Sequence, residues 1–509
     1  MKPSSAQGGG ITRRLLRFVE NTGNRLPDPV TLFAALTLLV MIISWIAAAQ
    51  SLSVRHPGTG DDISAINLFS TENIRRLFVE MPKTFAAFPP LGLVLVAMLG
   101  IGVADKTGLI ATALKGFMSK VPASLVTAAL VFAGIMSSLA ADAGYVVVIP
   151  LGAVLFHRVG RHPIAGLAAA FAGVSGGFSA NLLLTALDPL LAGFTQSAAQ
   201  LINPEYIVSA TSNYYIMIAL TPILTLTGVF VTEKIVEKHL GAYTPPADLK
   251  EESTEITKIE SRGLTAAIIA GLLTIGALAL LVLPEGAPLR DAAGEFGPFY
   301  SSIVALMLFV FFIPGLVYGI VTKQIKRDRD VAAMTAESMA DMGAYIVLAF
   351  VAAHFIAMFS WSNLGSIVAI SGANFLESIG FTGIPLLITF ILVAAVINLF
   401  VGSASAKWAI MAPIFVPMLM QLGYAPELTQ AAYRIGDSVT NILTPLLPYF
   451  PLIIIFARKY DKETGIGTIL SAMTPYSIAF GLVGIAVLIV WILLGLPLGP
   501  EGPLHYNPS

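Results

Sequence analysis

Residues 137–163 read SSLAADAGYVVVIPLGAVLFHRVGRHP, and residues 400–426 read FVGSASAKWAIMAPIFVPMLMQLGYAP. Both stretches begin with small polar residues, continue through an apolar run, and end at the pattern G-x-x-P. Proline removes a backbone donor and clashes with the preceding helical turn, so we expect a helix interruption at each proline. The helix breakers keep the same spacing in both halves, namely Pro150, Gly160, Pro163 and Gly173 in the first and Pro413, Gly423, Pro426 and Gly436 in the second.

The repeated breakers predict the place of a transport site. Inside a bilayer, an interrupted helix survives only within protein or around a watery cavity. Breaks at corresponding positions of two halves point to the binding site of a secondary transporter. Both stretches are too interrupted for a clean span, so each is expected to form a re-entrant hairpin. The alternatives are coincidence in a chain with 45 Gly and 31 Pro, and ordinary close packing by small residues.

Composition places the chain in a membrane. Of its 509 residues, 56% are hydrophobic and 12% are charged, and the mean hydropathy is +0.82. A soluble domain carries about 25% charged residues. Several charge-free runs exceed the roughly 20 residues that cross a bilayer; they are 29–54, 206–231, 263–284, 297–322, 378–406 and 465–500. The sequence therefore predicts an all-α polytopic membrane protein.

Several function classes lack sequence support. The chain has no Cys, which excludes disulfides, cysteine-based metal sites and redox motifs, and no covalent cofactor is expected. It has no Walker motif, HExxH or GxSxG in a supporting context, so neither ATP-driven pumping nor an enzyme is expected. The net charge is −1, and no basic face indicates nucleic acid as a partner. The expected partners are the lipid bilayer and a small-molecule substrate.

The distribution of Lys and Arg predicts the topology. Basic residues collect in 232–262, in 323–330 and again near Arg458, so these segments are expected on the cytoplasmic side. The short segment 285–296 and the C-terminus are then outside. Segment 51–85 is also expected outside although it carries four basic residues, and its composition indicates an ordered loop with a short interfacial helix.

These patterns divide the chain into six parts. They are a basic N-terminal segment with the first membrane helix and an external loop (1–87), a first repeat with a re-entrant hairpin (88–231), a cytoplasmic linker (232–262), scaffold helices with a basic loop (263–341), a second repeat with a re-entrant hairpin (342–460), and the last membrane helix with the tail (461–509).

Four ionisable residues lie within predicted membrane segments, where a charge costs at least about 2.5 kcal/mol and is a functional candidate by default. They are Asp142, Asp188, Arg434 and Asp437. Asp142 is either a cavity-facing group or a helix cap. Asp188 is either a substrate- or proton-linked carboxylate or a helix-end residue at an interface.

In and near the second stretch, two interpretations stay open for Arg434 with Asp437 and for Trp408. Arg434 and Asp437 share a helix face, so they either neutralise each other or serve a substrate carboxylate and an ion respectively. Asn398, Asp437 and Asn441 offer the oxygen ligands that Na⁺ requires. Trp408 either stacks on an aromatic substrate or anchors the chain at the membrane interface.

The sequence resembles the aminobenzoyl-glutamate transporter (AbgT) family along its whole length. The resemblance is carried by GRHPIAGLAAAFAGVSGGFSANLLLTALDPLLAG (160–193), FIAMFSWSNLG (355–365), SASAKWAIMAPIFVPM (403–418) and GLPLGPEG (495–502). It implies a homodimer in the bacterial inner membrane. Each protomer would have about nine transmembrane helices, two re-entrant hairpins and the inverted-repeat core of the ion-transporter superfamily.

The resemblance also assigns residues and a substrate class. It implies substrate-path residues at Asp188, Trp408, Pro426 and Arg434, and sodium ligands at Asn398, Asp437 and Asn441. Members of this family import p-aminobenzoyl-glutamate or export sulfonamides and p-aminobenzoate with an ion gradient, so a small aromatic carboxylate is the expected substrate.

We therefore expect an ion-gradient-driven secondary transporter, coupled to Na⁺ or to protons and working in import or efflux. A sodium-coupled dicarboxylate symporter is the alternative. An intramembrane enzyme and a channel are weaker hypotheses, because no nucleophile motif occurs and because repeated breaks favour alternating access.

Overall fold

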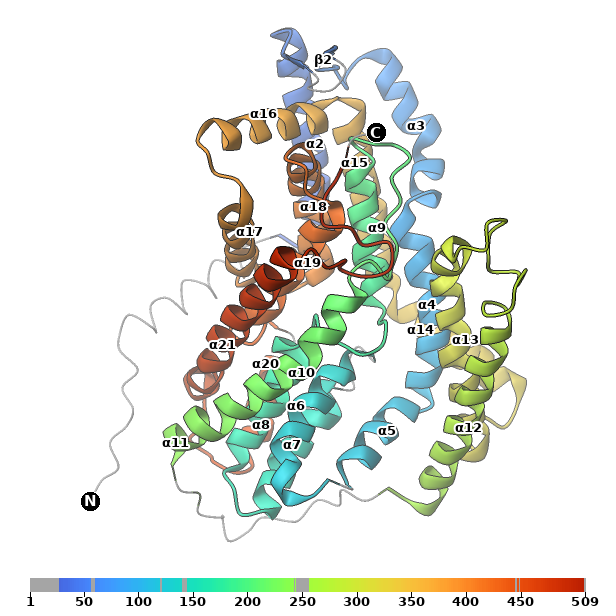
Figure 1. Ribbon diagram of the computed structural model, residues 1–509, viewed down its shortest axis with the longest axis vertical. Coiled ribbons are helices and arrows are strands. Elements are labelled where there is room, and N and C mark those ends of the chain that lie inside the picture. The colour runs from blue at the N-terminus through green and yellow to red at the C-terminus, as the bar shows by residue number, and fades with distance from the viewer. Residues whose placement is uncertain are drawn as a thin grey trace.

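The computed structural model describes residues 27–55, 60–119, 121–139, 144–241, 243, 256–444, 446–447 and 449–507. Helices dominate these residues, which confirms the predicted all-α class (Figure 1). In the same residues, strands are confined to one short antiparallel pair, β1 (Ser53–Arg55) and β2 (Asp62–Ser64). Asp142, one of the four ionisable candidates, lies outside the described residues.

The helices confirm a polytopic membrane protein. Seven helices of the described chain are long and apolar enough to cross a bilayer. An eighth span results if α5 (Leu109–Met118) and α6 (Val126–Met136), which are bent by 117° at the break between them, are counted together. The number of nine implied by the family resemblance stays a prediction.

The first half begins with the predicted external region. Helix α2 (Pro29–Ala49) leads through the β1–β2 pair into α3 (Thr71–Ala86), which has no buried residue and lies where a short interfacial helix was expected. The remaining elements of this half are α4 (Pro89–Lys106), α5, η1 (Ala123–Leu125), α6, η2 (Ser137–Leu139), η3 (Gly144–Val148), α7 (Ile149–Arg158), α8 (Pro163–Phe171), η4 (Ala172–Gly176), α9 (Leu187–Ala199), α10 (Tyr214–Val231), η5 (Thr232–Val236) and α11 (Glu237–Leu240).

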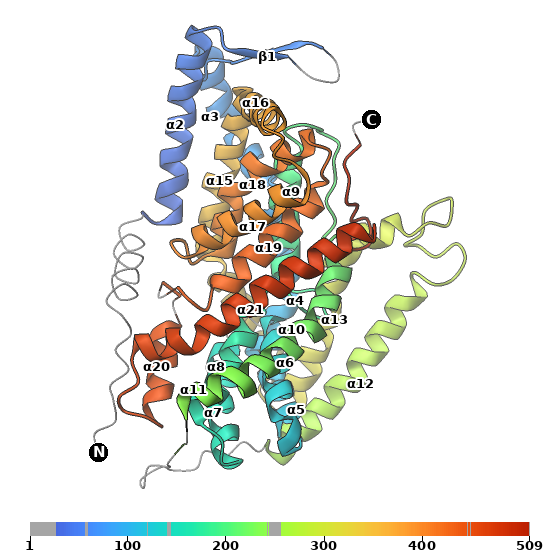
Figure 2. The ribbon, with the colours of Figure 1, turned by 60° about the vertical axis from the view of Figure 1, so that its left-hand side comes forward.

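Between the halves lie α12 (Lys258–Leu280), α13 (Gly297–Val321) and α14 (Asp328–Asp341). Helix α12 packs along α13, which packs along α4 (Figure 2). The second half comprises α15 (Gly343–Trp361), α16 (Leu364–Ser378), α17 (Gly383–Asn398), α18 (Ala404–Gln421), α19 (Pro426–Thr440), α20 (Phe450–Arg458) and α21 (Ile466–Leu493).

The two halves repeat the same order of helices. At the spacing of the sequence repeat, α6, α7, α8, α9 and α10 correspond to α17, α18, α19, α20 and α21. In each half a helical pair is followed by a helix that breaks off and resumes. The first break spans 177–186, between η4 and α9, and the second lies between the end of α19 and the start of α20.

The two halves point in opposite directions. The turn between α7 and α8 lies beside α11, because Arg161 forms an ion pair with Glu237 at 2.8 Å. The corresponding turn between α18 and α19 lies beside the C-terminal tail, since Tyr424 pairs with His505 in an isolated β-bridge. In Figure 1, α7, α8 and α11 lie at the lower end and the C-terminus at the upper end. The fold is therefore an inverted repeat, as predicted.

The spacing of helix breakers that the two halves share has a different structural basis from the one expected. Pro150 lies within the continuous helical stretch 144–158, where η3 passes directly into α7, and Pro413 lies inside the continuous helix α18. The expected interruptions at these prolines are wrong, since a membrane helix tolerates an internal proline when its surroundings satisfy the freed carbonyl. Gly160 and Gly423 instead end α7 and α18 with φ of 71° and 82°.

The remaining prolines mark helix starts, and the remaining glycines lie where two helices cross. Pro163 and Pro426 are the first residues of α8 and α19, a position for which their fixed φ is suited. Gly173 and Gly436 lie at close helix crossings, where an added Cβ would be 2.4 Å from the carbonyl oxygen of Val131 and 2.3 Å from that of Ile391. The repeat thus encodes two turns and two crossings.

Candidate transport site

The two helix breaks meet at the centre of the molecule. Ser438, near the end of α19, donates a hydrogen bond of 2.5 Å to Ser179 in the first break. Helix α9, which follows the first break, packs against α18 and α19 of the second half. Because the halves are inverted, this centre is built from the interrupted ends of both. Both breaks lie C-terminal to the prolines at which the sequence repeat predicted them.

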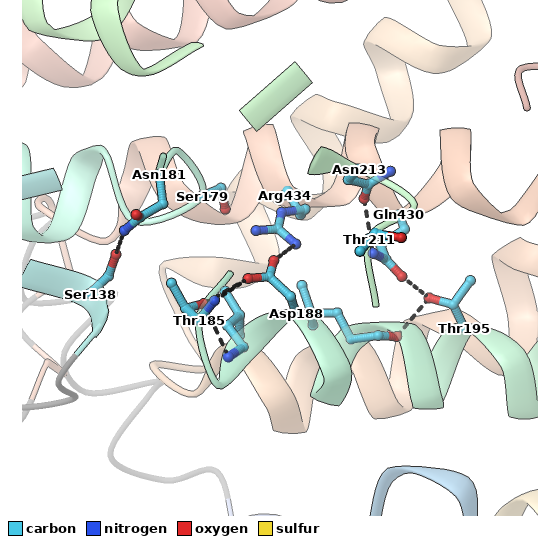
Figure 3. A network of polar contacts seen from close by, with 12 residues as sticks. Ser138, Ser179, Asn181, Thr185, Asp188, Thr195, Thr211, Asn213, Gln430 and Arg434 are labelled. Atoms are coloured by element: carbon cyan, nitrogen blue, oxygen red, sulfur yellow. Dashed lines mark hydrogen bonds and ion pairs between the residues drawn. The ribbon is translucent and has the colours of Figure 1, made fainter. Parts of the chain in front are cut away.

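A buried ion pair joins the two halves here. Arg434 of α19 donates from Nη1 to Oδ1 of Asp188 at 2.7 Å, and the side chains are 4% and 1% exposed (Figure 3). Asp188 lies in the first turn of α9, where the helix dipole favours a carboxylate. Its Oδ2 accepts from the backbone N–H of Thr185 at 2.6 Å and from the Thr185 hydroxyl at 3.0 Å.

Two sequence-based alternatives are settled by this geometry. The reading of Arg434 and Asp437 as an internal salt bridge is wrong, because Arg434 pairs across the repeat interface with Asp188. Asp188 is not a helix-end residue at the membrane surface, since it is fully buried. Within the described residues, Nε of Arg434 is buried and has no hydrogen-bond partner.

Trp408 is enclosed by protein. It is fully buried, its Nε1 donates to the Thr195 hydroxyl at 2.9 Å, and its ring stacks on Tyr433 with centroids 4.4 Å apart. This excludes the interfacial anchor, which needs a ring at the water boundary. Trp408 and Arg434 both contact α9, so two of the four implied substrate-path residues bind to the same helix of the other half. Pro426 begins α19, the helix that carries Arg434.

The predicted sodium ligands also come together, but around a lysine. Nδ2 of Asn398 donates to the Asp437 carbonyl oxygen at 2.5 Å and to Oδ1 of Asn441 at 2.9 Å. Lys407 is fully buried, forms an ion pair of 2.5 Å with Oδ1 of Asp437, and donates to Oδ1 of Asn398. Oδ1 of Asp437 and Oδ1 of Asn398 are thus directed at the ammonium group, whereas Oδ1 of Asn441 accepts from Asn398.

The sequence reasoning missed Lys407 and a polar chain beyond it. Lys407 was not among the four ionisable candidates, although a lysine between apolar runs is itself a functional candidate. Thr195 donates to Oε1 of Gln430 at 2.6 Å, and Nε2 of Gln430 donates to Oδ1 of Asn213 at 2.9 Å (Figure 3). Thr195, Asn213 and Gln430 are uncharged, so a search for ionisable residues within membrane segments did not select them.

An apolar cavity lies beside the first break. Its volume is about 700 Å³, it extends between α5, α12 and α13, and Leu183, Leu184 and Tyr214 line the end toward the site. A volume of this size is typical of small-molecule sites. The lining suits an aromatic ring rather than a carboxylate, whereas the charged groups lie at Asp188 and Arg434.

Fold and site together define an integral membrane transporter built from two inverted repeats. Discontinuous helices that meet at the repeat interface, with charged groups from both halves, are the arrangement of secondary-transporter binding sites. The family described as "AbgT putative transporter family" matches residues 14–506. The chain belongs to this family of transporters, as the sequence resemblance predicted.

Relatives and solved structures agree with this membership. The chain is 38% identical to the p-aminobenzoyl-glutamate transport protein of Escherichia coli (strain K12) over 501 residues, which cover 98% of this chain and 97% of the relative. It is 43% identical to the Alcanivorax borkumensis YdaH transporter, with a TM-score of 0.90, over 93% of this chain and 100% of that structure.

A third similarity is to Neisseria gonorrhoeae MtrF, described as illuminating a class of antimetabolite efflux pumps. The identity is 47% and the TM-score is 0.91, over 96% of this chain and 100% of that structure. The family and the apolar helices confirm a multi-pass protein of the bacterial inner membrane.

Proposed function

We propose that this chain is an ion-gradient-driven secondary transporter of p-aminobenzoyl-glutamate, p-aminobenzoate and related antimetabolites such as sulfonamides. The observation that carries the proposal is the Asp188–Arg434 pair at 2.7 Å, which joins the two inverted halves at the helix breaks. The relative from Escherichia coli is named for p-aminobenzoyl-glutamate, and the related MtrF is placed among antimetabolite efflux pumps.

The site chemistry suits an aromatic carboxylate. A guanidinium binds a carboxylate through parallel N–H donors, and Nε of Arg434 is buried without a partner among the described residues. A substrate carboxylate would bond to this N–H and draw Arg434 from Asp188. The apolar cavity beside the first break, which Leu183 and Leu184 help to line, would accept the aminobenzoyl ring. Chemistry at Asp188 and Arg434 thus links substrate binding to a contact between the halves.

Counterflow in proteoliposomes tests the proposal. Purified protein is reconstituted, the vesicles are loaded with unlabelled p-aminobenzoyl-glutamate, and entry of labelled substrate is followed. We expect saturable entry that depends on the internal substrate and recovery of chemically unmodified label. Entry that rises linearly with concentration would indicate a channel, and recovered p-aminobenzoate would indicate an enzyme.

Competition separates the proposal from the dicarboxylate alternative. Excess p-aminobenzoate should displace labelled p-aminobenzoyl-glutamate, while succinate should not. Sulfonamides share the aniline ring but have no glutamate carboxylates. In ligand binding to the purified protein, measured without transport, replacement of Arg434 by Gln should therefore lower the affinity for p-aminobenzoyl-glutamate by about tenfold or more, the loss of one charged hydrogen bond, and weaken sulfonamide binding less. Displacement by succinate alone would contradict the aromatic specificity.

We also propose a homodimer, an expectation carried over from the family resemblance. Helix α12 exposes Leu272 and Leu273 at 66% and 69%, as a lipid- or protein-facing helix would. Cross-linking in native membranes tests this proposal, and a single monomeric band at all cross-linker concentrations would contradict it.

A further inference from the structure

The first hairpin carries an aromatic ring at the position that Trp408 occupies in the second hairpin. The repeat spacing that relates Pro150 to Pro413 also relates Tyr145 to Trp408. Tyr145 lies in η3, which passes directly into α7, and Trp408 lies in α18, the counterpart of α7. Trp408 belongs to the substrate path that the family resemblance implies, whereas the proposed function gives Tyr145 no role.

The two aromatic residues make matching contacts within their own halves. Trp408 stacks on Tyr433 of α19, with ring centroids 4.4 Å apart. Tyr145 donates from its hydroxyl to the Ser175 hydroxyl at 3.2 Å. Ser175 lies in η4, which continues α8, the counterpart of α19. Each ring is thus held to the broken helix of its own half.

The two residues also make matching contacts with the opposite half. Trp408 donates to the Thr195 hydroxyl of α9 at 2.9 Å. Tyr145 stacks on Tyr449, the residue directly before α20, with centroids 4.2 Å apart and ring planes inclined by 11°. Because α20 is the counterpart of α9, the same pairs of elements are joined in both cases. Stacking and hydrogen bonding have only exchanged places.

The elements that hold Tyr145 lead to the opposite face from those that hold Trp408. Helix α7 ends at the turn beside α11, and α20 ends at Arg458, in a segment predicted to be cytoplasmic, while α18 ends beside the C-terminal tail (Figure 1). Tyr145 is 8% exposed and Tyr449 is partly buried, whereas Trp408 and Tyr433 are both 0% exposed. The Tyr145–Tyr449 stack is therefore the more accessible of the two, on the side of the cytoplasm.

The backbone at the first hairpin is also less regular. Tyr145 and Ser175 each lie in a single π-helical turn, η3 and η4, whereas α18 and α19 are regular α-helices at the corresponding positions. Single π-helical turns occur frequently at functional sites. This favours a role for the contact in binding or movement in addition to packing.

We propose that Tyr145 is a further substrate-path residue, the first-half counterpart of Trp408, and that the aromatic ring of the substrate stacks on Tyr145 in place of Tyr449 when the site opens to the cytoplasm. The inference rests on the proposed function. Aromatic rings attract each other in offset-stacked pairs, so one ring can replace another on the same face with little loss. Arg434 would then bind the carboxylate of the substrate, and Tyr145 would bind its ring.

Ligand binding to the purified protein tests the residue itself. The variant Y145L removes the ring and should weaken binding of p-aminobenzoyl-glutamate and of sulfanilamide by about tenfold each, the contribution of one stacked pair. Both ligands should lose affinity alike because both contain the aniline ring. The variant Y145F keeps the ring and removes only the hydroxyl that bonds to Ser175, so it should retain most of the affinity. Unchanged affinity in Y145L, or an equal loss in Y145F, would overturn the inference.

The matched control is Y318L in α13. Tyr318 is also buried, and its hydroxyl forms a hydrogen bond of 2.7 Å with Thr112. Its replacement should lower the melting temperature and leave the affinity for both ligands unchanged. A loss of affinity in Y318L equal to that in Y145L would show that general destabilisation, and not the ring of Tyr145, sets the affinity, which would overturn the inference.

The variant Y449L separates a surface for the substrate from a structural stack, and it applies even if Y145L does not fold. Because Tyr449 competes with the substrate for the face of Tyr145, its removal should raise the affinity for both ligands, by up to about tenfold. Unchanged or lowered affinity in Y449L would overturn the inference. Absence of p-aminobenzoyl-glutamate binding and counterflow in the unaltered protein would instead refute the proposed function, so the two failures are distinguishable.

Discussion

At the scale of single residues, the site is held by pairs that cross between the halves. Arg434 and Asp188 are far apart in the chain, yet both are buried and bonded to each other. Removing one member of a buried ion pair leaves the other charge without compensation, which costs about 3–5 kcal/mol. The pair therefore contributes to folding as well as to transport, and variants have to separate the two contributions.

The double variant D188N/R434Q provides that separation. Each single variant, D188N or R434Q, should lower the melting temperature and abolish transport, because one buried charge loses its partner. The double variant should be more stable than the sum of the single effects by about 1–3 kcal/mol, as expected for directly contacting residues, and should still fail to transport. Thermal unfolding and counterflow measure both effects. Normal transport in either single variant would remove the pair from the mechanism.

Trp408 makes a second prediction at this scale. The variant W408F keeps a ring against Tyr433 but loses the hydrogen bond to Thr195, so stability should fall by about 1 kcal/mol. The variant W408A also leaves a cavity and should lose about 3–5 kcal/mol. Thermal unfolding in detergent checks the order. Equal losses in the two variants would show that the ring is not packed as the structure has it.

At the scale of elements, glycines fix how the broken helices cross their neighbours. An added Cβ at Gly436 would lie 2.3 Å from the Ile391 carbonyl oxygen, and one at Gly173 would lie 2.4 Å from that of Val131. The first contact packs α19 against α17, and the second packs η4, which continues α8, against α6. The position of each break thus depends on backbone contact that only glycine permits.

The variants G173A and G436A should each lose about 1–3 kcal/mol, the usual consequence of overpacking. The matched control is G467A in α21, where an added Cβ meets nothing within 4 Å and alanine should stabilise the helix by up to about 1 kcal/mol. Melting temperatures in one detergent compare the three variants. A loss in G467A as large as that in G436A would contradict the proposed close crossings.

At the scale of elements, the sequence also left the positions of the helix breaks unpredicted. Gly160 and Gly423 were part of the repeated set of breakers, and the structure has an equivalent turn at each of them. The repeated prolines did not predict the breaks, because Pro150 and Pro413 both lie inside continuous helical stretches. The breaks fall instead in GFSANLLLTA (177–186) and in NILTPLLPY (441–449), and the Pro445 and Pro448 of the second stretch are not part of the repeated set of breakers. Pairing across the halves also depends on packing between segments that are distant in the chain.

At the scale of the whole molecule, composition and the repeat were sufficient for class and architecture. The charge-free runs predicted the membrane helices, and the repeat predicted two related halves. Asp188, Arg434, Asp437 and Asn398 were selected as intramembrane polar residues, and the structure brings them to one region. Lys407 was missed because its pairing with Asp437 is set by tertiary contact.

The inversion of the two halves is the central claim, because the site depends on breaks that meet from opposite sides. Arg158 and Gln421 are the last residues of α7 and α18, at corresponding positions of the repeat. Since the chain has no Cys, single cysteines at these positions report their own side of the membrane. Controls are K462C for the cytoplasmic side and E285C for the outside.

Labelling of R158C and Q421C with a membrane-impermeant maleimide, in right-side-out and inside-out vesicles, measures the inversion directly. The maleimide should label R158C in inside-out vesicles, as it labels the control K462C, because the α7–α8 turn lies beside α11. It should label Q421C in right-side-out vesicles, as it labels the control E285C, because the α18–α19 turn lies beside the C-terminal tail. Reaction of R158C and Q421C from the same side would contradict the inverted repeat and the transport site derived from it.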